Sequence, residues 1–347
     1  MRVNGRWSTR FAALALAVVA SSSAPAQSPA PGALPCAAPV ACAGTMSGGW
    51  CIDTFLAGDR TFPQFSGVWS DAPNDVWAVG AHTGARGAGR GFAFHWDGCA
   101  WSPASLPGGP QSTVGLGDVW GTRGDDLWIV GAQGSAFHWN GKAWSAVNTG
   151  AAGALEHVSG SSGADVWAFG TGGLFHWNGR AWSADARLPP KQSSEPVGDI
   201  WAVAPDDVWV AQGLNARGSL AHYDGARWTV VRPSPDLAFG LFGIWSNGAT
   251  TWAVGEGNQV VRSTNGRTWA QLAPPGGSSR GWVNVMGSAS ELWAAGQTVG
   301  RSTSGGALRS VAGVPPGFYP GLWLNESQVW IAGITNAGAA VVAHRAR

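Results

Sequence analysis

Charged residues are scarce in this chain. Only 12% of its 347 residues are Asp, Glu, Lys or Arg, and only two are lysines, whereas about a quarter of a soluble protein is usually charged. The formal net charge is +1. Because affinity for nucleic acid comes largely from cationic contacts with phosphates, this balance argues against a nucleic-acid partner. With 45% hydrophobic residues and little net charge, the chain is not globally disordered.

Long hydrophobic runs are also lacking. The longest, Phe11–Ala20, has ten residues, and a membrane-spanning helix needs about 20. Three arginines precede this run and an Ala-Pro-Ala tripeptide follows at 24–26, which is the pattern of a secretory signal peptide. We therefore expect no membrane span, a signal peptide at residues 1–26 and a secreted or periplasmic mature protein.

Cysteines are few, and none forms a C-x-x-C motif. The four disulfide candidates are Cys36, Cys42, Cys51 and Cys99. No histidine stands at metal-ligand spacing from any pair of them, so the sequence predicts disulfides and neither a metal nor another cofactor. Four cysteines allow three pairings, and the sequence does not choose among them.

Glycine and tryptophan are abundant, with 53 and 23 residues, and the tryptophans recur periodically. A pattern close to GVW-x5-DVWAVG is followed by FHW-[ND]-G-x-x-W. The tryptophan of the DVWAVG element recurs at intervals of 37 to 51 residues, at Trp77, Trp128, Trp167, Trp209, Trp252, Trp293 and Trp330. Each repeat divides into four short strands, here called A to D. Val-Trp-Ala-Val alternation is typical of a half-buried strand B, and Asn-Gly or Asp-Gly pairs are typical of a tight turn between strands C and D.

Seven units of about 40 residues with four strands each predict a seven-bladed β-propeller at residues 47–347, after a Pro/Ala/Cys-rich extension at 27–46. The last unit stops at a sequence typical of strand C, near His344. Residues near 47–56 resemble the missing outer strand, with Trp50 at the strand-D position. We therefore expect an N-terminal strand to complete the last blade.

The repeated tryptophans are expected to form the core between blades, because periodic apolar positions are usually buried. The alternative is a ring of sugar-stacking tryptophans. Histidines recur in strand C at His95, His138, His176 and His222, with His344 in the last unit. Each of the first four repeats that has this histidine also has an aspartate two residues before its strand-B tryptophan. Hydrogen bonding within each blade explains this pairing better than a metal ring.

The repeat resembles the DVWAVG/HWDG-type propeller repeats of exported bacterial proteins, which are related to Asp-box propellers. The segment Ser263–Trp269 is similar to a shortened Asp box. The resemblance implies a fold, not a chemistry. A sialidase-like enzyme would need an arginine triad and a Tyr–Glu pair, and the only tyrosines are Tyr223 and Tyr319. Fucose-binding propeller lectins carry a glutamate where this chain has Ala93 and Ala136.

Variable B–C and D–A links share one face of a propeller, and binding residues concentrate in such loops. The basic residues proposed to bind there are Arg86, Arg90, Arg187, Lys191, Arg217 and Arg280. We expect a monomeric, non-enzymatic interaction module for a protein or a surface glycan. The alternatives are a glycan-processing enzyme, a lectin and a periplasmic assembly scaffold. An enzyme should carry perturbed carboxylates at the axis, where strand A offers only Asp118 and Asp199.

Overall fold

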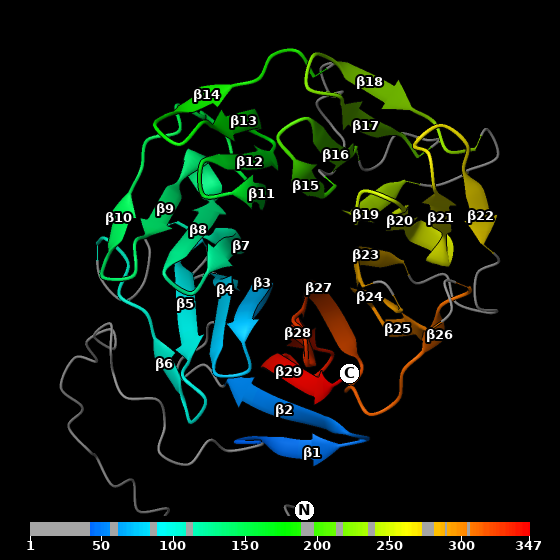
Figure 1. Cartoon of the computed structure of the whole chain (residues 1–347). Coiled ribbons are helices and arrows are strands. Elements are labelled where there is room, and N and C mark those ends of the chain that lie inside the picture. Colours follow the sequence, from blue (N-terminus) through cyan, green and yellow to red (C-terminus); the bar gives the residue numbers. More distant parts are fainter. Residues whose placement is uncertain are drawn as a thin grey trace, which may run out of the picture.

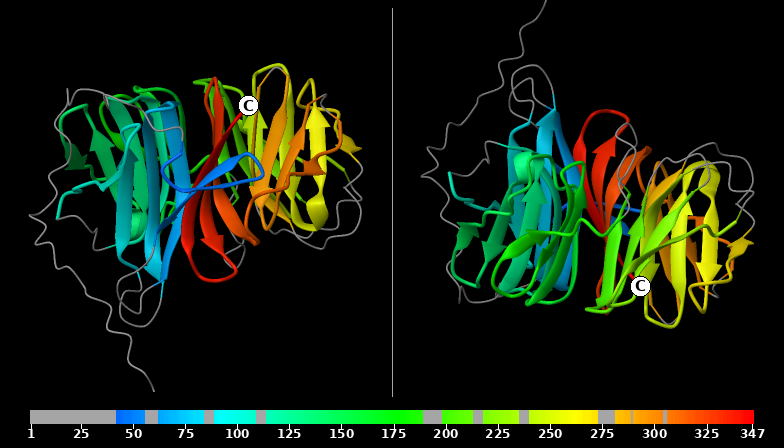
Figure 2. Two further views of the ribbon diagram at one scale, coloured as in Figure 1. Left: turned by 90° about the horizontal axis from the view of Figure 1, so that it is seen from below. Right: turned by 90° about the horizontal axis from the view of Figure 1, so that it is seen from above.

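The computed structural model describes residues 42–55, 62–83, 89–108, 114–188, 198–212, 218–234, 240–272, 281–288, 290–303 and 306–347. They form seven antiparallel sheets arranged radially around one axis (Figure 1). Seen from the side, the ring is a flat disc (Figure 2). The predicted seven-bladed β-propeller is therefore confirmed. The signal peptide predicted at 1–26 and most of the 27–46 extension lie outside the described residues.

Six blades have four strands each, in the order A to D from the axis outward. The first three comprise β3 (Phe62–Ala72), β4 (Asp75–Thr83), β5 (Gly91–Trp96) and β6 (Trp101–Pro103); β7 (Leu116–Arg123), β8 (Asp126–Gly131), β9 (Ala136–Trp139) and β10 (Trp144–Ala146); and β11 (His157–Ser162), β12 (Asp165–Gly170), β13 (Gly173–Trp177) and β14 (Trp182–Ala184). The next three comprise β15 (Ile200–Ala204), β16 (Asp207–Ala211), β17 (Leu220–Tyr223) and β18 (Trp228–Val231); β19 (Leu241–Ser246), β20 (Thr251–Gly255), β21 (Val260–Ser263) and β22 (Ala270–Leu272); and β23 (Trp282–Gly287), β24 (Leu292–Gly296), β25 (Val299–Ser302) and β26 (Arg309–Ser310). Two short 3₁₀ turns, η1 (Ala132–Gly134) and η2 (Glu256–Asn258), join strands B and C in the second and fifth blades.

The seventh blade is built from both ends of the chain. Its strands A to C are β27 (Gly317–Leu324), β28 (Gln328–Thr335) and β29 (Ala340–Ala346), and its strand D is β2 (Trp50–Phe55). In Figure 1, β2 lies directly against β29. The predicted closure is thus confirmed. One strand more than predicted, β1 (Thr45–Ser47), pairs with β2 on the outside, so the Gly48-Gly49 turn joins these two strands rather than strands C and D.

Tryptophans fill the spaces between the blades, which confirms their structural role. All seven strand-B tryptophans are buried. In the first three blades, each contacts two aromatic rings of the next blade; the sets are Trp77 with Trp139 and Trp144, Trp128 with Trp177 and Trp182, and Trp167 with Tyr223 and Trp228.

The C–D turns follow the predicted sequence but not the predicted backbone. Gly98, Gly141, Gly179 and Gly225 have positive φ, whereas the Asp or Asn before each does not. Instead, its side chain accepts backbone hydrogen bonds, as Asp97 does from the N–H groups of Cys99 (2.8 Å) and Ala100 (2.9 Å). The A–B and C–D turns lie on one side of the disc, called the turn face. The B–C and D–A links lie on the other side, called the loop face.

Candidate functional site

The recurrent histidines are held within their own blades, as predicted. In the first four blades, the histidine Nε2 lies 2.7–2.8 Å from the aspartate Oδ1, and the imidazole stacks on the strand-B tryptophan. In the fifth and sixth blades, Arg262 and Arg301 take the histidine position, each lying over its tryptophan at 5.1 Å.

The axis holds a small acidic cavity of about 30 Å³, which has room for only one or two water molecules. Asp118 of the second blade and Asp199 of the fourth both line it. Asp118 accepts hydrogen bonds from the backbone N–H groups of Val119 (2.8 Å) and Val158 (3.1 Å). On the third blade, His157 Nδ1 lies 3.5 Å from Asp199 Oδ1.

Burial controls the protonation of this cluster. Loss of hydration raises the pKa of Asp118 to about 7. Burial also raises the pKa of Asp199 well above its usual value, and the charge of Asp118 adds to that shift. Burial lowers the pKa of His157 to about 4, so this imidazole is neutral at pH 7. Perturbed axial carboxylates are the feature expected of an enzyme, and here they line a cavity of about 30 Å³.

Two tryptophan rings meet beside this cavity. Trp201 and Trp323, which come from the fourth and seventh blades, have ring centroids 6.4 Å apart. The indole N–H of Trp323 donates to the carbonyl of Ser70 (2.8 Å), and that of Trp201 donates to the carbonyl of Ser246 (2.8 Å). Each indole is thereby anchored to a neighbouring blade, and both rings line the cavity.

Larger cavities lie at the outer side of the turn face, between adjacent blades. Their volumes are about 670 Å³ between the fourth and fifth blades, 260 Å³ between the fifth and sixth, and 340 Å³ beside the sixth and seventh. Aromatic residues are lost where these cavities occur. At the strand-C position held by Trp or Tyr in the first four blades, the fifth to seventh have Ser263, Ser302 and Arg345.

The largest of these three cavities, here called the β18 groove, follows the outer strand of the fourth blade. It is lined by Thr229–Arg232, by turn residues 206, 207, 224, 227, 248 and 249, and by the fifth-blade turn 264–267. Val230 is 41% exposed, and only it and Met46 are exposed large hydrophobic residues in the described part of the chain. Arg232 and Arg267 form no ion pair with a described residue, whereas Arg227 lies 3.6 Å from Asp224. The groove thus combines an open strand edge, an apolar side chain and two available cations.

Of the six basic residues predicted to bind a partner, the structure describes two, Arg90 and Arg187. Arg86, Lys191, Arg217 and Arg280 lie outside the described residues. Arg90 is exposed at the base of the B–C hairpin of the first blade. Arg187 is held by Asp185 (2.6 and 3.0 Å) and by the Tyr223 hydroxyl (3.1 Å), so it serves the packing between the third and fourth blades.

One disulfide is defined: Cys42 pairs with Cys51. Cys99 is also disulfide-bonded, and Cys36 lies outside the described residues. A disulfide is typical of an oxidising compartment. In the described part of the chain, no helix is long and apolar enough to cross a membrane.

Solved propellers of low sequence identity are similar to this chain. The structure titled YCF48 bound to D1 peptide has a TM-score of 0.62 and 14% identity, covering 88% of this chain and 97% of that one. YCF48 from Cyanidioschyzon merolae has a TM-score of 0.61 and 14% identity, covering 85% and 98%. The WD40 repeats of RRP9 have a TM-score of 0.62 and 11% identity, covering 85% and 97%. No protein-family model and no curated protein matches the chain. The shared feature is the propeller fold.

Proposed function

We propose that this chain is an exported, non-enzymatic interaction module that binds an extended protein segment in the β18 groove. The observation that carries the proposal is the coincidence of an outer strand edge with a cavity of about 670 Å³, a volume typical of ligand sites. An extended segment can add to such an edge through main-chain hydrogen bonds, while side-chain pockets select its sequence.

The lining defines the chemistry of the bound segment. Exposed Val230 favours an apolar side chain. Arg232 and Arg267 favour a carboxylate, from an acidic residue or from a chain terminus. A solved propeller of the same fold has a bound peptide, the D1 peptide of the YCF48 structure, which supports a peptide ligand for this chain too.

Two sequence-based alternatives gain less support. For the glycan-processing enzyme, carboxyl groups with raised pKa values are present at the axis, but the cavity beside them is about 30 Å³, which is too small for a glycan substrate. The strand-B tryptophans that would stack on sugars are buried against neighbouring blades. We keep the loop face as the competing binding surface, since Arg86 and Arg90 provide a direct test of it.

The test is selection of peptides from a displayed random library, followed by fluorescence anisotropy with the best fluorescein-labelled peptide. Val230→Asp and the double variant Arg232→Ala/Arg267→Ala should each weaken binding at least tenfold. Ala146→Asp is the matched control, because Ala146 occupies the same strand-D position in the second blade.

Three outcomes would contradict the proposal: no selected peptide, equal binding by Val230→Asp, or loss of binding only in Arg86→Ala/Arg90→Ala. The last would move the site to the loop face. A glycan array with the same proteins provides the remaining comparison, since saturable glycan binding without peptide binding would favour the lectin alternative.

A further inference from the structure

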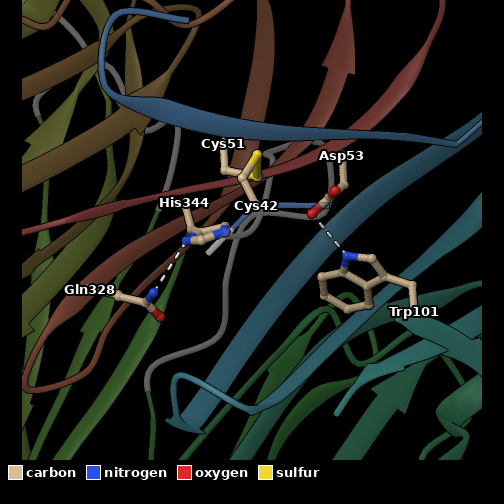
Figure 3. The surroundings of a disulfide bond; sticks show 6 residues. All are labelled: Cys42, Cys51, Asp53, Trp101, Gln328 and His344. Atoms are coloured by element: carbon tan, nitrogen blue, oxygen red, sulfur yellow. Dashed lines mark hydrogen bonds between the residues drawn. A yellow bond between two sulfur atoms is a disulfide. The ribbon is translucent and has the colours of Figure 1, made fainter. Parts of the chain in front are cut away.

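Cys51 and His344 lie opposite each other in the β2–β29 ladder of the seventh blade. Asp53 is two residues further along β2 and therefore lies on the same face as Cys51. The Sγ of Cys51, a carboxylate oxygen of Asp53 and a ring nitrogen of His344 all lie within 4.8 Å of one another, and all three residues are buried. Because Cys42 is bonded to Cys51, two sulfurs, one oxygen and one nitrogen gather at this point (Figure 3).

His344 is turned differently from the equivalent histidines. In the first four blades, Nε2 binds the local aspartate. Gln328 replaces that aspartate in the seventh blade, and it contacts Nδ1 of His344 instead, at 3.3 Å. The other nitrogen of the imidazole, Nε2, faces Asp53 and Cys42 (Figure 3). Stacking on Trp330, with ring centroids 4.2 Å apart, fixes the plane of the imidazole.

Asp53 is 7% exposed and has no cationic partner among the described residues. Its Oδ2 accepts a hydrogen bond from the indole N–H of Trp101 on the first blade (3.0 Å). Burial raises the pKa of this carboxyl group. A cation beside it would stabilise the charged form, and Trp101 would then orient a metal-binding carboxylate, as residues behind metal ligands commonly do.

We propose that reduction of the Cys42–Cys51 disulfide converts this cluster into a Zn²⁺ site with Cys42, Cys51, Asp53 and His344 as ligands. Thiolate, imidazole and carboxylate ligands in a set of four are the usual tetrahedral zinc donors. Zinc bonds of about 2.0–2.3 Å would require the donor atoms of Cys51, Asp53 and His344 to approach one another by about 1 Å, and the two sulfurs to move apart once their bond is reduced. Binding through Nε2 places the proton of His344 on Nδ1. The Gln328 amide oxygen, which accepts from the Trp330 indole N–H (3.1 Å), can accept this proton only if the amide turns over and gives up that bond.

The site forms in two steps. The disulfide is reduced by two electrons, and Zn²⁺ then replaces the protons of the two thiols. A dithiol reductant transfers two electrons and two protons to the disulfide, giving two cysteine thiols and the oxidised, cyclic disulfide of the reductant. Zn²⁺ then displaces one proton from each thiol and forms two Zn–S bonds. Asp53 also releases its proton if it was protonated.

The two cross-links hold different parts of the molecule. The disulfide joins two cysteines nine residues apart, both N-terminal to the first blade. The zinc site would join β2 to β29, and so the two ends of the chain at the point where the ring closes. Reduction with zinc present would therefore replace a local link with one across the closure. The proposal is independent of the β18 groove.

The experiment is a Co²⁺ titration of the full chain carrying Cys36→Ser and Cys99→Ser, so that Cys42 and Cys51 are the only thiols. After reduction with a water-soluble phosphine, which competes little for the metal, one equivalent of Co²⁺ should give the visible bands of a tetrahedral site and a thiolate charge-transfer band. Zn²⁺ should abolish both. The oxidised protein should give neither.

His344→Gln and Asp53→Asn, in the same background, should lower the affinity for zinc at least tenfold in competition with a chromophoric chelator. The matched control is His138→Gln, which alters the same strand-C position in the second blade and should leave the affinity unchanged. The proposal is wrong if the reduced protein gives no tetrahedral cobalt spectrum, or if neither ligand variant changes the affinity. If reduction unfolds the protein, recovery of its near-ultraviolet circular dichroism with zinc supports the proposal, and failure to recover contradicts it.

Discussion

Trp209 and Trp269 form an edge-to-face contact between the fourth and fifth blades, with ring centroids 5.8 Å apart and planes at 77°. The strand-B tryptophans of the first three blades each contact a second ring, which lies on strand C of the next blade. The fifth blade has Ser263 at this strand-C position, so Trp209 lacks that contact. The β18 groove thus lies where one aromatic side chain of the repeat has been lost. Its position follows from the aromatic contacts between adjacent blades, because one of those contacts is missing there.

Ser263→Tyr restores an aromatic residue that the fourth blade already accepts as Tyr223. We expect the new ring to pack on Trp209 and occupy part of the groove, since aromatic pairs contribute about 0.5–1.5 kcal/mol beyond their burial. Peptide affinity should fall at least tenfold in fluorescence anisotropy while the melting temperature stays equal or rises. Ser302→Tyr, which alters the next cavity, is the control. Undiminished peptide binding by Ser263→Tyr would exclude the groove as the site.

The axial carboxylates predict an unusual pH dependence. The folded-state pKa of Asp118 is about 7, above the unfolded value of about 3.9. Its contribution to stability is therefore fully present below pH 3.9 and is lost as the pH rises through 7. Asp199 acts in the same direction. His157, with its pKa lowered to about 4, acts oppositely, because its neutral form is favoured by folding.

Asp118→Asn isolates one of these groups. Relative to the natural chain, the variant should gain about 2–4 kcal/mol of unfolding free energy between pH 4 and pH 8. Urea denaturation at several pH values measures this difference, and the contributions of groups that both proteins share cancel. A difference that stays constant over this range would show that Asp118 is ionised throughout.

The architecture could be predicted from the sequence because each of its causes is local and repeated. The strand-B tryptophans, the turn glycines and the His–Asp pairs such as His138 with Asp126 recur in register, and all lie where the repeat places them. Even the closure could be predicted, since the last unit lacks an outer strand and the residues around Trp50 supply one.

Features that depend on departures from the repeat could not be predicted in this way. The β18 groove arises from a missing ring at Ser263, and the serine gives no positive signal of a cavity. The predicted closure places Cys51 of strand D beside His344 of strand C, but the pairing of Cys51 with Cys42, which adds the second sulfur, was one of three that the sequence left open. The shared axial cavity of Asp118 and Asp199 depends on how strand-A side chains converge on the axis.

The pair of His138 with Asp126 should stabilise the second blade mainly above acidic pH. Hydrogen bonding from His138 holds the pKa of Asp126 below its usual value. The stabilisation is therefore present above the unfolded pKa of about 3.9 and is lost as the pH falls through the lower folded value. Asp126→Asn should cost about 1 kcal/mol at pH 7 in urea denaturation, with the difference closing in acid. Asp125→Asn, beside it on the exposed turn, should cost less than about 0.5 kcal/mol, and an equal cost for both would contradict the assignment.

Closure of the ring by β2 should dominate the stability of the seventh blade. Trp50 has no exposed surface and meets Trp293 of the sixth blade edge-to-face at 6.1 Å. Trp50→Ala removes that contact and leaves a cavity between the blades, so it should cost about 3–5 kcal/mol in urea denaturation. Met46→Ala, only four residues earlier but 62% exposed on β1, should change the midpoint little. If both variants unfold at the urea midpoint of the natural chain, the N-terminal strand does not hold the ring closed in solution.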